Sequence, residues 1–536
     1  MSEQKETELT NWADAAADVL LERKKDAYVC EGMWSPSGYF HIGNARTEIF
    51  TPYAVHHALE DRGYKSTQNF IVDDFDEIKK IPSGLEIKES EHENFLGFPC
   101  ALAPSPTEGY KTWADAFGGQ VKDFLPDFGV GPKIISAYET YKSGKFNDLI
   151  IHSLNNAEKI TEVWNKVSGS EKPKTFLPVK VLCPDCGKLA FTKATAWDGK
   201  EVTYKCKCGS EGSVTPLNGN AKLHWRVHWS AHWALHNVDF ESGGKDHFSK
   251  GGSVDVSQAF MKEIFHKPGP YQLPTEFIQV KGAKMAGSVG NVINLEEWLK
   301  VSQPETFRFL NFTYRPNKAI DFSLRDNSFV LLMERFERAE RIYYGLEEDR
   351  SEKLNNKTKR EYELSVAGTL PDESPIQIAY QFATFLAQIH NPETQLPETL
   401  SLLKEMGHLP ENELSNDQKE KLQKKFIRAK YWVENYAPED FKIIFIESVS
   451  EEVQNEISEI EKKALSEIST NLKTTSQEDE IKQTIFDSAK ANEIQPKRMF
   501  QLLYLLLIGK SQGPKLGTLI LALGKERCIN RLKEVV

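Results

Sequence analysis

The sequence predicts an α/β protein built on a doubly wound parallel sheet, with a metal-binding insertion in the sheet domain and an all-α region after it. Residues 27 to about 300 alternate short apolar runs with stretches of helical periodicity, the pattern of a parallel sheet covered by helices. Four cysteines cluster between about 176 and 216, and beyond about 300 the periodicity is helical. Ligands of such sheets bind at the carboxyl ends of strands, so residues that follow a strand are the first candidates for function.

The composition is that of an ordinary globular protein. The chain has 536 residues, of which 27% are charged and 40% hydrophobic. The net charge of −11 and the pI of about 5.8 argue against a general nucleic-acid coat protein, but not against one basic face on an acidic protein. No apolar run approaches the roughly 18 residues that span a bilayer. The polar start, Met-Ser-Glu-Gln-Lys, lacks the apolar core of a signal peptide, so we expect a cytoplasmic protein with no membrane partner.

The first element expected is a leading helix within residues 1–26. Its apolar residues recur at helical spacing: Leu9, Trp12, Ala13, Ala16, Ala17 and Leu20. A short apolar run from Tyr28 to Cys30 then predicts a buried parallel strand. The Ser-Pro-Ser-Gly segment at 35–38 predicts a turn, and residues 44–60 carry helical periodicity again.

The sequence His41-Ile42-Gly43-Asn44 lies where this strand gives way to the helix. Free N–H groups and the dipole at a helix N-terminus bind phosphate, and glycine at positions 38 and 43 allows close backbone approach. His41 and Asn44 can donate hydrogen bonds to phosphoryl oxygens as charge builds on them. The competing interpretation is a buried histidine in an ordinary strand–turn–helix.

A second segment far along the chain complements the first. Residues 273–280 form an apolar, strand-like stretch, and a glycine-rich loop with Lys281 and Lys284 follows it. Such a loop can close over a triphosphate and neutralise it, whereas the simpler interpretation is an exposed basic turn. Together, and in this order, the two segments predict attack on the α-phosphate of ATP.

The cysteine cluster predicts a structural zinc site. The pairs C-x2-C and C-x-C are separated by 19 residues and comprise Cys183, Cys186, Cys206 and Cys208. Four thiolates beside glycine turns suit tetrahedral Zn²⁺ and leave no position for a catalytic water. The residues between the pairs alternate as hairpin strands do. Free or redox-active cysteines are the alternative.

Residues 223–237 read LHWRVHWSAHWALHN, with tryptophan and histidine each recurring every fourth residue. On a helix each set forms a stripe along one face. Histidines four apart can bind a metal ion, but no glutamate or cysteine nearby in the sequence completes a set. The stripe is therefore interpreted as aromatic packing beside a polar stripe.

Helices are expected through the rest of the chain, at 331–344, 376–390, 422–436 and 499–507, with a last helix after a turn at 509–515. Residues 450–490 are rich in Lys and Glu, as a solvated helix face would be. The charged, proline-containing segment 349–375 is expected to be a linker or long loop. The expected domains are a leading helix (1–26), a catalytic domain (27–300) with the insertion 176–216 inside it, and a helical region (301–536).

The two segments resemble the signature sequences HIGH and KMSKS of class I aminoacyl-tRNA synthetases. The stretch 73–82, Asp-Asp-Phe-Asp-Glu-Ile-Lys-Lys-Ile-Pro, and Gly244-Lys245-Asp246-His247 narrow the resemblance to the class I lysyl-tRNA synthetases, found mainly in archaea and some bacteria. The likeness runs from about residue 11 to the C-terminus. Two departures matter: the second signature reads KMAGS, so Gly287 replaces a lysine, and His228 replaces an acid of the family.

The resemblance implies a Rossmann-like catalytic domain that joins L-lysine to tRNA(Lys) through a lysyl-adenylate, with ATP and Mg²⁺, and a helical cage that binds the anticodon. It implies that the terminal ribose attacks through its 2′-hydroxyl, and we expect a monomer. Catalysis is expected from His41, Asn44, Lys284 and Ser288. ATP binding is expected from Gly38, His41, Gly43, Asn44, Lys281 and Lys284. The lysine pocket is expected to comprise Gly32, Trp225, His247 and Glu276.

Three alternatives stay open. The chain could charge another amino acid, such as glutamate, glutamine or cysteine, although the 73–82 stretch argues against it. It could be a cofactor-making nucleotidyltransferase, which would need neither the zinc insertion nor the large helical region. It could be a catalytically silent tRNA-binding paralogue, against which the intact His41, Asn44 and Lys284 argue.

Overall fold

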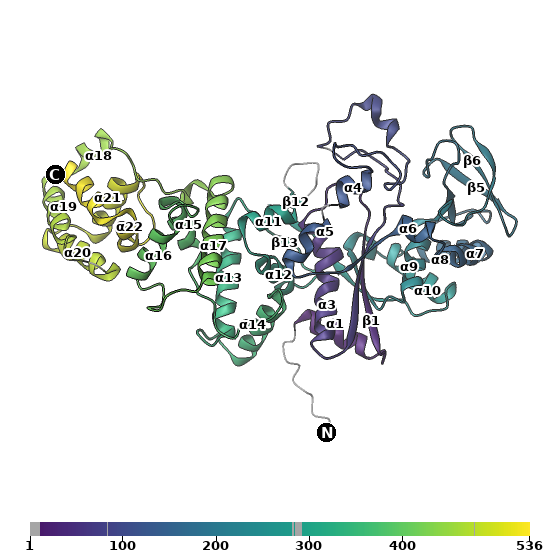
Figure 1. Ribbon diagram of the computed structural model, residues 1–536, viewed down its shortest axis with the longest axis horizontal. Coiled ribbons are helices and arrows are strands. Elements are labelled where there is room, and N and C mark those ends of the chain that lie inside the picture. The colour runs from purple at the N-terminus through teal and green to yellow at the C-terminus, as the bar shows by residue number, and fades with distance from the viewer. Residues whose placement is uncertain (1–10, 83, 120, 281–282, 285–291, 476) are drawn as a thin grey trace, which may run out of the picture. The chain divides into compact units, whose positions relative to one another are not determined.

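A computed structural model describes residues 11–536 except 83, 120, 281–282, 285–291 and 476 (Figure 1). For Ala283 and Lys284 it describes the backbone alone. The contacts between residues divide the chain into two compact units. Unit 1 comprises Met1–Leu299, Gln303–Ser323 and Arg338–Glu373, and unit 2 comprises Lys300–Ser302, Leu324–Glu337 and Ser374–Val536.

Unit 1 is built on a five-stranded parallel sheet in the order β10-β9-β1-β2-β3. Its strands are β1 (Ala27–Trp34), β2 (Lys65–Val72), β3 (Lys133–Ser136), β9 (Phe240–Gly244) and β10 (Tyr271–Thr275). The chain runs outward from β1 to β2 and β3, then returns to β9 and β10 on the other side of β1. The predicted doubly wound sheet is confirmed, and its topological switch point lies between β1 and β9.

Helices pack on this sheet because each buries an apolar face. In α1 (Trp12–Leu21), Ala13, Ala16, Ala17 and Leu20 are buried, and the helix packs on α3 (Thr51–Glu60), which confirms the leading helix. The tryptophan and histidine stripe is helical as predicted, as α9 (Trp225–His236). Further helices of unit 1 include α4 (Trp113–Gly118), α5 (Val121–Phe124), α6 (Ala137–Lys142), α7 (Asn147–Asn155), α8 (Ala157–Ser168) and α10 (Ser253–Glu263).

The cysteine-bearing insertion is a small antiparallel sheet. It comprises β5 (Thr192–Trp197), β6 (Val202–Cys206) and β7 (Glu211–Val214), as the alternating pattern predicted. The paired strands β4 (Val179–Val181) and β8 (Ala221–Leu223) carry the chain into and out of it. Val202 and Tyr204 are buried in one core with Val181 and Leu223, so the insertion shares the core of unit 1.

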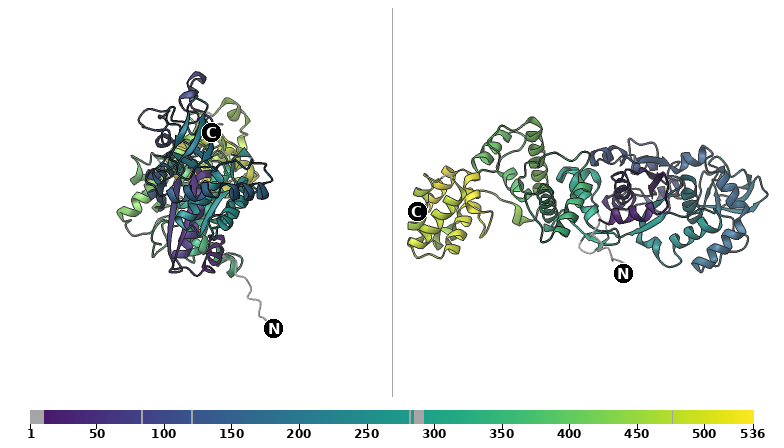
Figure 2. Two further views of the ribbon diagram at one scale, coloured as in Figure 1. Left: turned by 90° about the vertical axis from the view of Figure 1, so that its right-hand side faces the viewer. Right: turned by 90° about the horizontal axis from the view of Figure 1, so that it is seen from below.

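Every regular element that the structure describes within unit 2 is helical (Figure 2). Trp432 on α17 (Asn416–Asn435) is buried, packs on Phe329 and donates its Nε1–H to the carbonyl of Leu324 at 2.8 Å. The other helices are α15 (Tyr380–Ile389), α16 (Leu396–Glu405), α18 (Glu451–Glu456), α19 (Glu459–Asn471), α20 (Glu478–Ala491), α21 (Pro496–Ile508), α22 (Leu516–Leu523) and α23 (Lys525–Glu534). Helices α11 (Leu295–Val301) and α13 (Asn327–Tyr343) contain the unit boundaries, and α12 (Pro304–Thr313) belongs to unit 1.

The expectation of a linker over 349–375 is wrong, because α14 (Glu352–Ser365) occupies its first half. Ser351 caps this helix by accepting from the N–H of Leu354. Arg360 then pairs with Asp14 at 3.0 Å and with Asp61 at 2.8 Å. The helix was not predicted because its mean hydropathy is low: charged residues such as Arg360, which pair with distant partners, outnumber the buried apolar residues Tyr362 and Leu364.

In the part of the chain that the structure describes, no helix combines the length and apolar character needed to cross a membrane.

Candidate active site

The first signature segment opens a continuous helical stretch after β1. It passes from α2 (Ile42–Asn44) through a π-helical turn, η1 (Ala45–Phe50), into α3. In the π turn, the N–H of Thr51 bonds to the carbonyl of Arg46, five residues back. Single π turns inside α-helices occur often at functional sites. The strand–turn–helix expected here is confirmed, with a turn type that periodicity did not predict.

His41 is the N-cap of this helix. Its Nδ1 accepts from the backbone N–H groups of Gly43 at 3.1 Å and Asn44 at 3.3 Å, while the Oδ1 of Asn44 accepts from the N–H of His41 at 3.2 Å. Because Nδ1 is an acceptor, the proton of the neutral ring is on Nε2. The expectation that free helix N–H groups would bind phosphate is wrong for these two groups, because His41 already uses them.

The two predicted glycines have different surroundings. A Cβ at Gly43 would stand 2.9 Å from Nδ1 of His41, so this position has no room for a side chain while the cap is formed. A Cβ at Gly38 would be in ordinary contact with Pro82 at 3.6 Å. Steric exclusion therefore explains glycine at 43, whereas the role of Gly38 in ATP binding stays a prediction.

The structure describes the chain on both sides of the second signature segment. Strand β11 (Ile278–Val280) pairs with β12 (Ala283–Lys284) and with β13 (Ile320–Asp321). The predicted Lys281 and Ser288 lie outside the described residues, as does the side chain of Lys284. Just after this loop, the carbonyl of Ile293 accepts the backbone N–H of Ile42 at 2.9 Å. The residue that follows the second signature segment thus contacts the first signature segment, just after the carboxyl end of β1.

Two residues of the predicted lysine pocket lie together. Trp225, at the start of α9, stacks on Trp229 with ring centroids 5.2 Å apart. His247, on the short helix η4 (Lys245–Phe248) after β9, lies 5.9 Å from the Trp225 ring and 5.4 Å from the Trp229 ring. Burial lowers the pKa of His247, so its ring is neutral at pH 7. These rings form an aromatic wall beside the switch point.

Glu276, the predicted carboxylate of that pocket, already has a partner. It follows β10, and Lys245 pairs with its carboxylate at 2.8 Å. The Lys245 ammonium also lies 5.0 Å from the centroid of Phe277. A substrate ammonium bound by Glu276 would therefore have to displace Lys245.

Gly32, the predicted pocket floor, packs against the π turn. A Cβ there would lie 2.0 Å from the carbonyl oxygen of Glu48, so only glycine lets the turn approach β1 this closely. The side chain of Glu48 bends to β1 as well, where its Oε2 accepts the N–H of Met33 at 3.2 Å. Burial raises the pKa of Glu48 well above its usual range. Sequence reasoning missed Glu48; the signal was an acidic residue in an apolar stretch directly after the first signature.

The acidic stretch after β2 belongs to a buried network. Lys222 donates to both carboxylate oxygens of Asp73 at 2.8 Å. His228 Nε2 lies 3.5 Å from the same carboxylate, and its Nδ1 lies 2.8 Å from the hydroxyl of Tyr141. The ammonium of Lys222 and the ring of His228 lower the pKa of Asp73 despite its burial. His228, which departs from the family pattern, therefore belongs to a buried network that joins α9 to Asp73 and Tyr141.

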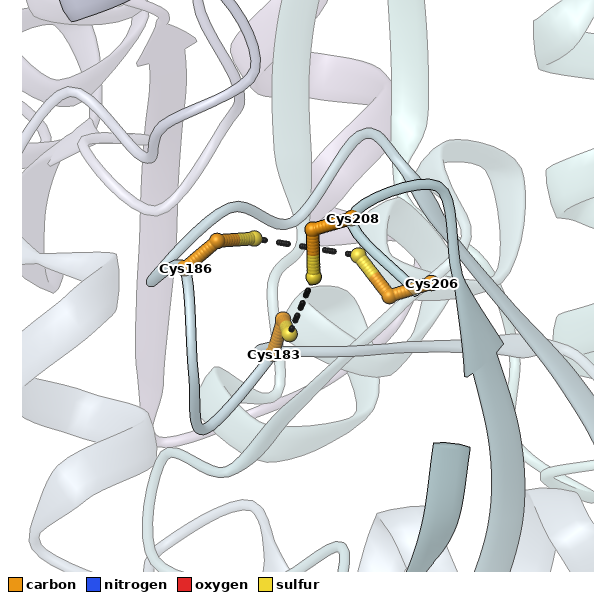
Figure 3. Close-up of side chains that lie close together, drawn as sticks. All are labelled: Cys183, Cys186, Cys206 and Cys208. Atoms are coloured by element: carbon orange, nitrogen blue, oxygen red, sulfur yellow. Dashed lines mark hydrogen bonds between the residues drawn. The ribbon is translucent and has the colours of Figure 1, made fainter. Parts of the chain in front are cut away.

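The four predicted zinc ligands converge on one point (Figure 3). Cys183 Sγ lies 3.7 Å from Cys208 Sγ, and Cys186 Sγ lies 3.7 Å from Cys206 Sγ. All four sulfurs lie within 4.8 Å of one another. Zn–S bonds of about 2.3 Å in a tetrahedron place sulfurs roughly 3.8 Å apart, so the residues present fit Zn²⁺.

Comparisons with known proteins agree with this geometry. The family model described as tRNA synthetases class I (K) matches residues 10–367, and an anticodon binding domain matches 390–536. A lysine–tRNA ligase of Pyrococcus horikoshii is 34% identical, with 98% of this chain and 99% of that protein covered. The lysine–tRNA ligase of Thermococcus kodakarensis is 36% identical, again with 98% of this chain and 99% of that protein covered. The lysine–tRNA ligase of Borrelia garinii subsp. bavariensis is 32% identical, with 96% of this chain and 98% of that protein covered. On the strength of this full-length similarity, the chain belongs to the class I lysyl-tRNA synthetase family.

Proposed function

We propose that this enzyme attaches L-lysine to tRNA(Lys) in two steps, through lysyl-adenylate. The observation that carries the proposal is the hydrogen bond between Ile42, in the first signature segment, and Ile293, which follows the second signature segment in the chain. Membership in the class I lysyl-tRNA synthetase family supports lysine as the amino acid. The matched anticodon-binding domain supports tRNA as the second substrate.

In the first step the carboxylate of lysine attacks the α-phosphate of ATP and pyrophosphate leaves. The carboxylate is already ionised at pH 7, so no general base is needed. Catalysis then consists of positioning and charge stabilisation. The proton on His41 Nε2 and the amide of Asn44 are donors fixed by the cap, and we assign them to the oxygens that gain charge. Lys284, with Lys281 and Ser288, is proposed to neutralise the pyrophosphate, and Mg²⁺ accompanies ATP.

Lysine recognition is proposed at the wall of Trp225 and His247, beside Gly32. Aromatic faces and a carboxylate suit an ammonium that has lost its water. As the carboxylate partner of the ammonium, we favour Glu48 over Glu276. The raised pKa of Glu48 reflects a desolvated carboxyl that a bound cation would stabilise, whereas Glu276 already has Lys245.

Other assignments stay proposals. We propose Zn²⁺ at the cysteine cluster, as a structural ion that cross-links the insertion. The terminal ribose of tRNA is proposed to attack through its 2′-hydroxyl, with residues 301–536 contacting the tRNA stem and anticodon. A monomeric state, a cytoplasmic location and the domain limits at 26, 176, 216 and 300 are likewise predictions.

The test is amino-acid-dependent ATP–pyrophosphate exchange with each standard amino acid, with and without tRNA. Exchange with lysine alone is the expected result. Exchange with another amino acid would keep the adenylation mechanism and reject the pocket. Binding of tRNA with no exchange in any mixture would instead identify a silent tRNA-binding paralogue.

A further inference from the structure

A second group of metal-binding side chains lies buried between α9 and the sheet of unit 1. His232 and His236 are four residues apart on α9, and Glu31 belongs to β1. One donor atom from each of the three residues lies within 4.8 Å of the donor atoms of the other two. The sequence alone offered no acid near the histidines, because Glu31 lies about 200 residues before them and only the sheet brings it there.

His232 is a fully buried histidine. Its exposed fraction is 0%, and neither ring nitrogen has a hydrogen-bond partner among the residues that the structure describes. Neutral imidazole is the form of histidine that binds metals. Buried polar atoms are nearly always satisfied, so an unpaired one indicates a bound water or ion.

Glu31 lies beside a second buried carboxyl group. Its neighbour in the parallel register is Glu241, so two buried carboxyl groups lie side by side. Glu241 accepts from the indole of Trp229 at 3.0 Å, but no lysine or arginine within the described ranges pairs with either glutamate. Two buried carboxyl groups side by side either hold a proton or need a positive charge near them.

Hydrogen bonds already hold the Glu31 carboxylate in one orientation. Asn69, its register neighbour on β2, donates to Glu31 Oε2 at 3.1 Å. His236 Nδ1 lies 2.7 Å from the same oxygen. Hydrogen bonds of this kind commonly fix the orientation of ligating carboxylates.

We propose that Glu31, His232 and His236 bind a divalent transition-metal ion, with Zn²⁺ as the best match. Two imidazole nitrogens and one carboxylate oxygen form a familiar zinc donor set, with a water in the fourth position. Bonds of about 2.0–2.1 Å separate tetrahedral donors by roughly 3.4 Å. Binding would therefore open the 2.7 Å contact between His236 and Glu31 by about 0.7 Å and draw His232 towards them.

This ion would link a helix of unit 1 to the sheet. It would join the C-terminal half of α9 to the central strand β1, while the first turn of the same helix presents Trp225 to the proposed lysine pocket. The site is separate from the cysteine cluster in residues and in donor chemistry, so each can be lost while the other remains.

The test is a cobalt titration of the full-length protein after removal of bound metal with a chelator. The expected uptake is about two equivalents per chain, because Co²⁺ replaces Zn²⁺ in both donor sets. The cysteine site should show thiolate-to-cobalt charge transfer in the near ultraviolet. The second site should show only the weaker visible bands of nitrogen and oxygen ligands.

The variants separate the two sites. H232L should remove one equivalent and the weaker bands while the charge-transfer band stays, and E31Q, which keeps the shape of the side chain, should do the same. C186S should lose the charge-transfer band and retain the other spectrum. H224L is the matched control, since His224 precedes α9, packs on Phe176 and belongs to neither site.

An uptake of one equivalent with charge transfer, unchanged in H232L and E31Q, would overturn the proposal. It would leave a hydrogen bond between His236 and Glu31, with water at His232. Two equivalents retained by both variants would overturn it equally. Circular dichroism of each metal-free variant checks that the loss of metal is not a loss of fold.

Discussion

At the scale of single residues, the ring of His41 combines an observed function with a proposed one. Nδ1 closes the N-terminal cap, and the proton on Nε2 is the proposed donor to a phosphoryl oxygen. A substitution that removes both atoms would confuse loss of structure with loss of catalysis. Asparagine separates them, because it is among the best N-cap residues and lacks the distal donor.

His41→Asn should therefore keep the stability of the protein and lose adenylation. We expect a fall of about 10²- to 10³-fold in the rate of lysine-dependent ATP–pyrophosphate exchange, the usual cost of one lost transition-state donor. The melting temperature should change little, whereas in His41→Ala both quantities should fall. An exchange rate close to that of the unmodified enzyme would remove His41 from the mechanism.

Glu48 should lower the free energy of unfolding of the protein at pH values at which its carboxyl group is ionised. Its pKa in the folded protein is raised well above 4.5, the value expected when unfolded, so the unfolded state ionises first as pH rises. Stability contributed by this group is complete below about pH 4.5 and is lost as pH rises through the folded pKa. Glu48→Gln can still accept from Met33 but has no charge.

We expect Glu48→Gln to raise the melting temperature at pH 7 to 8, with the gain disappearing as pH falls towards about 4.5. The same variant should raise the KM for lysine at least tenfold, since the desolvated charge pairs with the substrate ammonium. Thermal melts over pH and exchange kinetics measure both. Glu60→Gln, on the exposed side of α3, is the control, and a KM equal to that control would transfer the role to Glu276.

At the scale of elements, the strongest sequence signals gave elements of the right type. The apolar run at 28–30, the stripe at 223–237 and the paired cysteines predicted β1, α9 and the insertion, because each has a local pattern. Three features of the structure have no local sequence pattern and were not predicted. The π turn differs from an α-helix only in hydrogen-bond spacing, α14 is rich in charged residues that pair with distant parts of the chain, and Glu31 meets His232 only through the sheet.

The insertion should depend on the proposed zinc ion. Cys186→Ser removes one of four thiolates, so we expect the zinc of the cysteine cluster to be lost and the melting temperature to fall. The strands β5 to β7 should lose protection in hydrogen exchange first, since the ion cross-links the turns beside them. Cys528→Ala, a buried cysteine of α23, is the control. Unchanged zinc content by mass spectrometry in Cys186→Ser would reject the cysteine site.

At the scale of the whole molecule, the chain does not divide at one point. Residues 300–302 and 324–337 belong to unit 2, whereas 303–323 and 338–373 belong to unit 1. All of the proposed adenylation residues lie in unit 1, while the family model for anticodon binding matches residues 390–536. Trp432, within that match, covers Phe329.

A chain that ends after Tyr436 should therefore separate the two half-reactions. It retains α15 and α17, and with them the packing of Trp432 on Phe329, so we expect a folded protein with nearly full lysine-dependent exchange. Charging of tRNA should fall by orders of magnitude. A chain that ends at 389 lacks α17, exposes the apolar residues beneath it and should aggregate. Full tRNA charging by the longer fragment would place anticodon recognition elsewhere.

The π turn after the first signature determines the direction of the Glu48 side chain through one extra residue in the turn. Each residue of an α-helix adds about 100° of rotation about the helix axis. One extra residue in a turn therefore rotates the side chains before the turn by about 100° relative to those after it. With Thr51 bonded to Arg46 instead of to Thr47, Glu48 faces β1 while α3 keeps its apolar face on the sheet. A single-residue deletion within 45–50 would restore ordinary helix and still misdirect the carboxylate, although no functional side chain had been changed.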